Sequence, residues 1–175
     1  MRLVENIFYC FIHKSCYIHN IMPVIVVYFH TPGCSNKALN HLVALYDPPY
    51  SHCDLQFEDG MLSSVYQHCG AIWRKCDFSG RGFCDVKVEV SDAGYQLAYD
   101  MCCRRAENGY KFDFTRVYGF LVNAQGDGDS FRTFCSKQCV EALQIAGVDA
   151  VLGMVGGDTT PSALFRALDA CVIKV

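Results

Sequence analysis

The sequence lacks both a run of basic residues and a long hydrophobic run. Lysine and arginine number 15 against 18 aspartates and glutamates, and the formal net charge is −3. Because proteins that grip nucleic-acid phosphates carry clustered positive charge, this composition gives no electrostatic basis for nucleic-acid binding. The clearest apolar run, Val24 to Phe29, is far shorter than the roughly 20 residues that span a bilayer. We therefore expect no transmembrane segment.

Metal-binding motifs and a regular cysteine framework are also missing. None of the twelve cysteines forms a C-x-x-C pair, and their irregular spacing is not that of a small disulfide scaffold. The sequence therefore indicates no structural zinc, and nothing in it points to another metal or to an organic cofactor. We expect most cysteines to be reduced core residues of an intracellular protein in a reducing compartment. A secreted, disulfide-bonded protein is the alternative.

What the sequence does contain is enough apolar material for one folded domain. The residues A, V, I, L, M, F, W, Y and C make up 51% of the 175 positions, which suits one domain with a proper core. Residues 1–21 show neither a clear period nor a signal-peptide design. We interpret them as an N-terminal extension of uncertain order, followed by a single domain at 22–175.

Strand-like and helix-like patterns both occur along that domain and predict an α+β fold. Alternating or β-branched segments predict strands at 24–29, 51–57, 61–66, 71–76 and 86–90, with a last one at 172–175. Helical spacing predicts helices at 36–45, 92–107, 136–146 and from 161, the second capped by Ser91 and the last by Thr160. In the first helix, Ala38, Leu42 and Leu45 are predicted to form one apolar stripe, with Leu39 and Val43 beside it. The aromatic segment 110–122 is expected to pack on the sheet.

A cysteine lies where one of these helices begins. Cys135 directly precedes the helix predicted at 136–146. Free backbone N–H groups and the helix dipole favour an anion at that end, which lowers the pKa of a thiol and makes the thiolate a nucleophile. The alternative is that Cys135 is a small buried hydrophobe, as most free cysteines are.

A histidine that could serve such a thiolate lies on a predicted strand. Side chains two apart on a strand share a face, so His52 and Asp54 point the same way and Cys53 points the other way. An imidazole beside a carboxylate, with a cysteine at a helix start elsewhere in the chain, is the arrangement of a thiol hydrolase. His52 would take the thiol proton and return it to the leaving group. The backbone N–H of Cys135 would help to bind the oxyanion.

Four segments carry a resemblance to a known family, in a chain order of histidine before cysteine that is the reverse of papain's. They are YSHCDLQFEDG at 50–60, LSS at 62–64, GYKFDF at 109–114 and FCSKQCVEAL at 134–143. Together they resemble the circularly permuted papain-fold hydrolases of the NlpC type, above all those encoded by viruses and phages, which are related to lecithin–retinol acyltransferase-like proteins. Such proteins show an S-H-hydrophobic-E pattern, an aspartate–glycine hairpin, a G-x-x-Y-D segment and a W/F-C-S-E helix start. The resemblance covers about residues 22 to 170.

The resemblance implies a fold and a set of site residues. The fold would be an antiparallel sheet packed against helices, one of which begins at the nucleophilic cysteine. Cys135 matches the family nucleophile, His52 the family base, and Asp54 the frequent glutamate two residues after the histidine. Lys137 stands where the family often has glutamate, and Phe112-Asp113 replaces Tyr-Asp. The polar residue that orients His52 is left open between Asp54, Ser64 and Gln67.

Three functions follow as hypotheses. The resemblance first implies a cysteine peptidase or amidase that cleaves an amide, peptide or isopeptide bond of a peptide or ubiquitin-like substrate, in the host-cell cytoplasm if the chain is viral. A lipid acyl hydrolase or acyltransferase of the same fold is the second hypothesis. A catalytically inactive binding or structural protein is the third. The oligomeric state is not predicted.

The other polar candidates are expected to be structural. His30, at the end of the first strand, is expected to be a surface or packing residue, while His41 and His68 are expected to face solvent. Asp113 is expected to be capping or buried in a hydrogen bond, and the aromatic residues of 110–120 to lie in the core.

Overall fold

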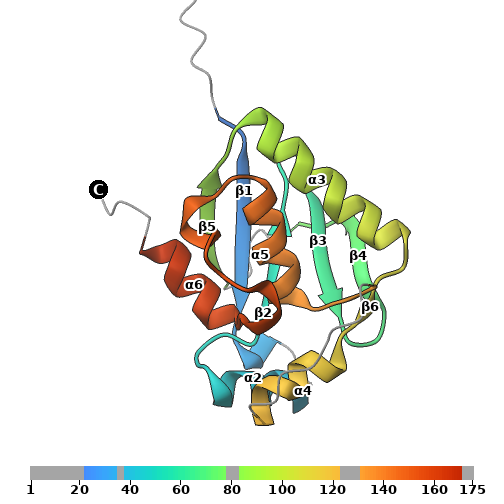
Figure 1. Cartoon of the computed structure of the whole chain (residues 1–175), viewed down its shortest axis with the longest axis vertical. Coiled ribbons are helices and arrows are strands. Elements are labelled where there is room, and N and C mark those ends of the chain that lie inside the picture. Colours follow the sequence, from blue (N-terminus) through green and yellow to red (C-terminus); the bar gives the residue numbers. More distant parts are fainter. Residues whose placement is uncertain (1–21, 35–37, 78–82, 123–130, 171–175) are drawn as a thin grey trace, which may run out of the picture.

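The computed structural model describes residues 22–34, 38–77, 83–122 and 131–170. These residues form a mixed α+β structure in which helices cover one face of a five-stranded antiparallel sheet (Figure 1). The predicted α+β class is therefore confirmed. The predicted extension at 1–21 and strand at 172–175 lie outside the described residues. No helix within the described ranges is both long enough and apolar enough to cross a bilayer.

The sheet has the spatial order β4-β3-β2-β1-β5, and every neighbouring pair is antiparallel. Its strands are β1 (Val24–His30), β2 (His52–Gln56), β3 (Met61–Tyr66), β4 (Gly70–Lys75) and β5 (Cys84–Glu89). All five were predicted within one or two residues. The hairpin between β2 and β3 turns at Gly60, whose φ of 80° is a left-handed conformation that suits glycine.

The two faces of the sheet have different chemistry. Ile25, Val27 and Phe29 of β1 are fully buried and point toward the helices, together with Cys53 and Leu55 of β2. The alternating residues therefore point to the opposite face. On that face, β1 and β2 bring polar side chains together, since Tyr28 lies opposite Asp54 and His30 lies opposite His52.

Three helices cover the apolar face: α3 (Asp92–Glu107), α5 (Cys135–Ile145) and α6 (Pro161–Asp169) (Figure 1). The predicted caps are confirmed, because Ser91 Oγ accepts a hydrogen bond from the N–H of Gly94 and Thr160 Oγ1 accepts one from the N–H of Ala163. Helices α5 and α3 pack against each other on this face, α5 over β2 and β3 and α3 over β4, and Val140 and Leu143 of α5 have no exposed surface. The two helices meet so closely at Gly94 that a Cβ there would lie 2.3 Å from the carbonyl oxygen of Ala146.

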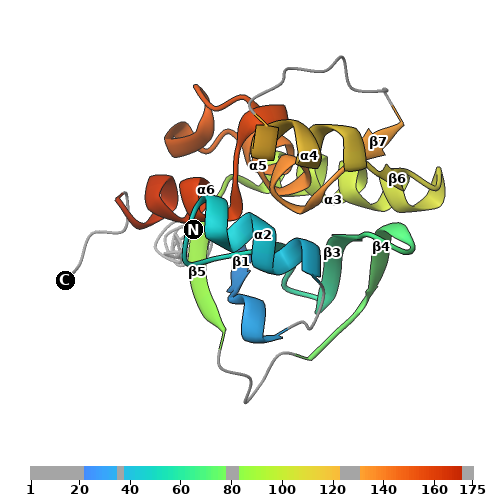
Figure 2. The ribbon, with the colours of Figure 1, turned by 90° about the horizontal axis from the view of Figure 1, so that it is seen from below.

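The remaining elements are shorter. They are α2 (Ala38–Tyr46), α4 (Phe114–Val122), the two-stranded parallel pair β6 (Lys111–Phe112) and β7 (Arg132–Thr133), and the 3-10 turns η1 (Pro32–Cys34), η2 (Asp149–Val151) and η3 (Gly156–Asp158). Figure 2 shows α2 and α4 side by side at one end of the sheet.

One prediction for these elements is wrong and another is wrong in part. In α2 the predicted stripe faces outward, with Leu42 43% and Leu45 80% exposed, and Leu39, predicted beside the stripe, is the residue that is buried. The reason is that Leu39 packs against Val117 of α4 and against Phe134, a contact that helical spacing alone does not reveal. Segment 110–122 was expected on the sheet, and its β6 part does contact β3 and β4, but its helix α4 packs against α2 and η3. As a result two of its aromatic residues, Phe114 and Tyr118, are exposed rather than in the core.

Candidate functional site

Cys135 is the first residue of α5. Phe134 occupies the N-cap position without a side-chain cap, and the first helical hydrogen bond runs from the N–H of Gln138 to the carbonyl of Phe134. The N–H groups of the first turn therefore have no acceptor within the helix and present partial positive charge at its start. The Cys135 side chain is 8% exposed and lines a cavity.

His52, the first residue of β2, is held through one ring nitrogen. Its Nε2 lies 2.9 Å from Asp54 Oδ1 and 3.1 Å from Ser64 Oγ, and all three side chains are buried. Because an ionised carboxylate only accepts hydrogen bonds, Nε2 carries a proton that it donates to Asp54. The ring of Tyr66 stacks on the imidazole at a centroid distance of 5.1 Å. Since Nε2 is occupied, Nδ1 is the nitrogen that remains for a thiol.

The charges of His52 and Asp54 stabilise each other. Burial favours the neutral form of the Asp54 carboxyl group, but the charge on His52 and the contacts of His30 and His52 outweigh it and hold its pKa well below the usual range. Burial likewise favours neutral His52. The charges of Asp54 and Cys135, with hydrogen bonds to both, outweigh that effect and raise the pKa of His52 well above its usual value. Asp54 is thus an anion and His52 is readily protonated.

The Cys135 sulfur interacts directly with His52 and with the neighbouring residue on β2. Its pKa lies well below that of an ordinary thiol, first because the Cys53 thiol donates a hydrogen bond to it. The charge of His52, a hydrogen bond from His52 and one from the backbone N–H of Cys53 lower it further, against the effect of burial. The pKa of Cys53 itself is raised well above its usual value, with burial as the main cause. The site therefore favours a thiolate at Cys135 beside an imidazolium at His52 and a protonated thiol at Cys53.

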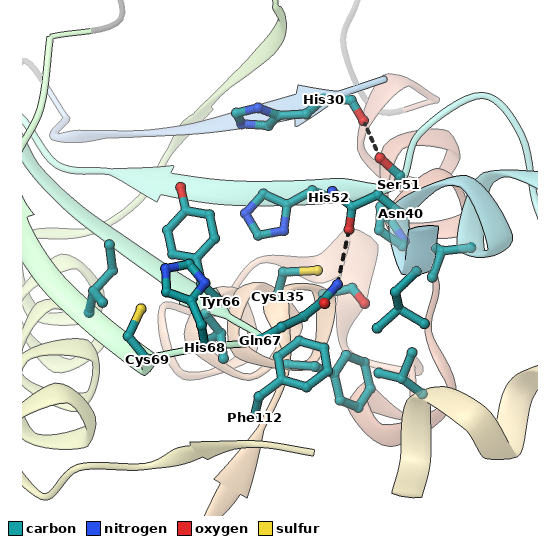
Figure 3. Close-up of a pocket in the computed structure, with 18 of the residues that line it drawn as sticks. His30, Asn40, Ser51, His52, Tyr66, Gln67, His68, Cys69, Phe112 and Cys135 are labelled. Atoms are coloured by element: carbon teal, nitrogen blue, oxygen red, sulfur yellow. Dashed lines mark hydrogen bonds between the residues drawn. The ribbon is translucent and has the colours of Figure 1, made fainter. Parts of the chain in front are cut away.

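The cavity beside Cys135 has a volume of about 430 Å³ (Figure 3). It opens between the polar face near the start of β2 and the ends of α2 and α4. His30, His52, Tyr66 and Cys135 contribute its reactive or polar wall. Much of the remaining wall is apolar, including Leu39, Val43, Leu62, Ile72, Phe112, Val117 and Phe134. A substrate carbonyl in this cavity would have direct access to the thiol.

The structure brings some of the candidate residues together and not others. Asp54 and Ser64 both reach His52, whereas the Gln67 side chain donates to Asn40 Oδ1 at 3.5 Å (Figure 3). Gln67 lines the cavity but does not hold the imidazole. Of the three candidates left open by the sequence, Asp54 is therefore best placed to orient His52, with Ser64 as a second contact.

His30 makes a contact in the site that the sequence did not predict. It was expected to be a surface or packing residue; it is 9% exposed, and its Nε2 lies 2.8 Å from Asp54 Oδ2. The signal that could have revealed it is the pairing of β1 with β2, which places His30 directly opposite His52. That register is a tertiary property and was not part of the strand prediction.

The other expected roles are mostly confirmed. His41 and His68 are exposed, although His68 also lines the cavity. Asp113 is buried, and its Oδ1 accepts a hydrogen bond from the N–H of Arg116 at the start of α4. Eight described cysteines are free, but only four of them are buried: Cys53, Cys102, Cys135 and Cys139. Among the described residues, no group of three or more His, Cys, Asp and Glu side chains is placed to hold a metal.

Comparison with models of known protein families, with curated proteins and with solved structures finds no significant match. The geometry of the site therefore has to be interpreted from the residues of this chain, and the resemblance described above remains a prediction.

Proposed function

We propose that this protein is a cysteine hydrolase with a permuted papain-like fold of the NlpC type. Cys135 is the nucleophile, His52 the general base and acid, and Asp54 the residue that orients His52. The observation that carries the proposal is a thiol at a helix start in contact with an imidazole whose Nε2 is held by a buried carboxylate. Thiol hydrolases need this combination, because the imidazole keeps the thiol ionised and supplies the proton that the leaving group needs.

In the proposed reaction, the Cys135 thiolate attacks the carbonyl carbon of an amide, peptide or isopeptide bond. The N–H of Cys135 at the start of α5 stabilises the oxyanion. His52 then gives its Nδ1 proton to the leaving nitrogen, the C–N bond breaks, and a thioester acyl-enzyme remains. A water molecule gives one proton to His52 and attacks the thioester, which releases the acid and restores the thiolate. Asp54 stabilises the imidazolium that is present before the first proton transfer and again after the second.

The substrate that we propose is a peptide or a ubiquitin-like chain in a reducing, intracellular compartment. A free thiolate needs such a compartment, because oxidation would block it. The largely apolar cavity wall favours an apolar group next to the scissile carbonyl.

A second candidate function is an acyl hydrolase or acyltransferase acting on a lipid. The observation that favours it is again the cavity, whose apolar side chains from α2, β3, β4 and α4 could surround an alkyl chain. The two candidates share the same covalent step and differ in the acyl group and in the leaving group. They are separated by comparing p-nitrophenyl esters of increasing chain length with peptide amides, because an acyl enzyme would favour the longer esters.

The first test of the proposal is the pH dependence of alkylation by iodoacetamide, with every cysteine followed by peptide mass mapping. We expect Cys135 to react fastest and to remain reactive well below the ordinary thiol pKa of about 8.5. His52→Ala should abolish that advantage. His41→Ala, which removes an exposed histidine on α2, serves as the matched control and should leave it unchanged.

The second step is to trap the acyl-enzyme by mass spectrometry after incubation with an activated ester. An acyl adduct on Cys135 that is absent in His52→Ala would support a hydrolase. If Cys135 reacts no faster than the other cysteines, or is indifferent to His52, the hydrolase proposal is refuted. A binding role without catalysis then becomes the better account.

A further inference from the structure

The Asp54 carboxylate lies between two histidines. Its Oδ1 contacts His52 Nε2 at 2.9 Å, and its Oδ2 contacts His30 Nε2 at 2.8 Å. The carboxylate has no exposed surface, and each imidazole side chain is 11% exposed. The two histidines lie on adjacent strands, and both line the cavity next to Cys135 (Figure 3).

The contact with His30 stabilises a buried oxygen of the Asp54 carboxylate. No other described residue supplies Oδ2 with a hydrogen bond, and an oxygen of an ionised carboxylate that is buried without a partner is costly. Because a carboxylate accepts only, a nitrogen at 2.8 Å must carry a proton if the contact is to be attractive. At 2.8 Å the two atoms are at ion-pair distance, although the contact is not a well-aligned hydrogen bond.

We propose that His30 is a positioning residue of the site. It acts through Asp54: the protonated Nε2 of His30 holds Oδ2 in place, so that Oδ1 stays on His52 Nε2 and Nδ1 of His52 stays directed at Cys135. This proposal rests on the cysteine hydrolase function proposed above. It assigns His30 no contact with the substrate and no proton transfer in the reaction.

The alternative role for His30 is packing. Its ring lies against Phe83 at a centroid distance of 4.2 Å and against His52 at 5.3 Å. If His30 only fills space, a side chain of similar size can replace it without changing the pKa of Cys135. If His30 positions Asp54, only a side chain that donates a hydrogen bond to Oδ2 can replace it.

Other titratable groups also face this part of the site. They are Tyr28 of β1, which lies opposite Asp54, His52 of β2, Tyr66 of β3, and Cys135 and Cys139 of α5. Asp85 of β5, and Cys76 and Asp77 after β4, lie near Tyr28. Burial raises the pKa values of Tyr28, Tyr66 and Cys139, and Asp54 adds to the effect on the last two. The three are therefore neutral across the pH range of the test.

The test compares His30→Gln with His30→Leu in the full chain. The Nε2 of glutamine can reach the place of the imidazole Nε2 and donate to Oδ2, whereas leucine cannot donate at all. The readout is the apparent pKa of Cys135, obtained from its rate of alkylation by iodoacetamide between pH 4 and 9. For His30→Leu we expect that pKa to rise by about one unit, which lowers the rate at acidic pH about tenfold. For His30→Gln we expect a rate within about threefold of the natural chain.

The outcomes separate the possibilities. If His30→Leu leaves the profile unchanged, or if both variants are equally impaired, His30 is a packing residue and the proposal is overturned. If Cys135 of the natural chain shows no lowered pKa, the cysteine hydrolase proposal fails first, whatever the variants do. Circular dichroism of each variant shows whether it is folded.

A measurement on the natural chain does not depend on how the variants fold. Nitrogen-15 NMR of the histidine side chains reports which ring nitrogen carries the proton. We expect His30 to be protonated at Nε2 at neutral pH. If His30 carries its proton on Nδ1 alone, it cannot donate to Asp54, and the proposal is wrong.

Discussion

His30 and His52 lie directly opposite each other in the β1–β2 pair, with their ring centroids 5.3 Å apart and the carboxylate of Asp54 in contact with both. Two imidazoles on neighbouring strands thus share one buried anion. The consequence is that the charge of His52, and through it the ionisation of Cys135, depends on residues from two strands and one helix. The following predictions probe that dependence and the packing that supports it.

Replacing Asp54 by asparagine should weaken the thiolate. The amide is nearly the same size but carries no charge, so it no longer stabilises the imidazolium form of His52. We expect the apparent pKa of Cys135 to rise by at least about one unit, so that the alkylation rate at a pH below that pKa falls at least about tenfold. The measurement is the pH profile of iodoacetamide labelling. Asp85→Asn, which removes an exposed carboxylate on β5, is the control and should leave the profile unchanged; a matching fall in both variants would contradict a specific role for Asp54.

The stability of the protein should depend on Asp54 at acidic pH. Against the effect of burial, the charge of His52 and the contacts of His30 and His52 hold its folded-state pKa below the ordinary value, so the folded state binds this proton less readily than the unfolded state. Its contribution is therefore fully present above about pH 4 and is lost as the pH falls toward the folded-state pKa. The free energy of unfolding, measured with urea, should fall more steeply below pH 4 for the natural chain than for Asp54→Asn. Parallel curves for the two proteins would show that the buried pair does not stabilise the fold.

Replacing two adjacent serines on β3 by alanine should affect different properties, the stability in one case and the reactivity of Cys135 in the other. Ser64 Oγ contacts His52 on the polar face, whereas Ser63 Oγ accepts a hydrogen bond from Gln138 Nε2 on the helical face. Ser63→Ala leaves a buried amide donor without a partner and should cost about 1–3 kcal/mol of unfolding free energy, without changing the pKa of Cys135. Ser64→Ala should change the alkylation profile more than the stability. Urea unfolding and the pH profile of alkylation are measured on both variants. If Ser63→Ala changed the profile and Ser64→Ala the stability, the assignment of the two serines to the helical and polar faces of the sheet would be wrong.

Gly94→Ala should destabilise the contact between α3 and α5. The new Cβ would lie 2.3 Å from a backbone oxygen, which cannot rotate away as a flexible side chain could. We expect a loss of about 1–3 kcal/mol of unfolding free energy, as for other overpacked sites. Gly153→Ala, where a Cβ meets nothing within 4 Å, is the matched control and should be nearly neutral. Equal urea midpoints for the two variants would contradict the close approach.

Local patterns in the sequence predict the elements well. Alternation placed the strands, capping residues such as Ser91 and Thr160 marked helix starts, and the period of two placed His52 and Asp54 on one face. These features depend on neighbours in the chain, which is why they are visible without a structure.

Features that depend on distant partners were missed. The buried side of α2 is set by Val117 and Phe134, and the role of His30 is set by the register of β1 against β2. The choice between Asp54, Ser64 and Gln67 likewise required knowing where β3 ends relative to His52. The cavity is formed by elements from most of the described chain, so no single motif encodes it.

The order of the strands has a consequence for when the thiol becomes reactive. His30 and Cys135 belong to β1 and α5, which lie far apart along the chain, and β2 contacts both elements. Contacts between such distant segments form late, after the long intervening loops have closed. An unfolded or newly made chain therefore carries twelve ordinary thiols, and Cys135 acquires its distinct reactivity only on final assembly. Brief labelling pulses during refolding would thus use Cys135 as a built-in reporter of the moment at which the native state is reached.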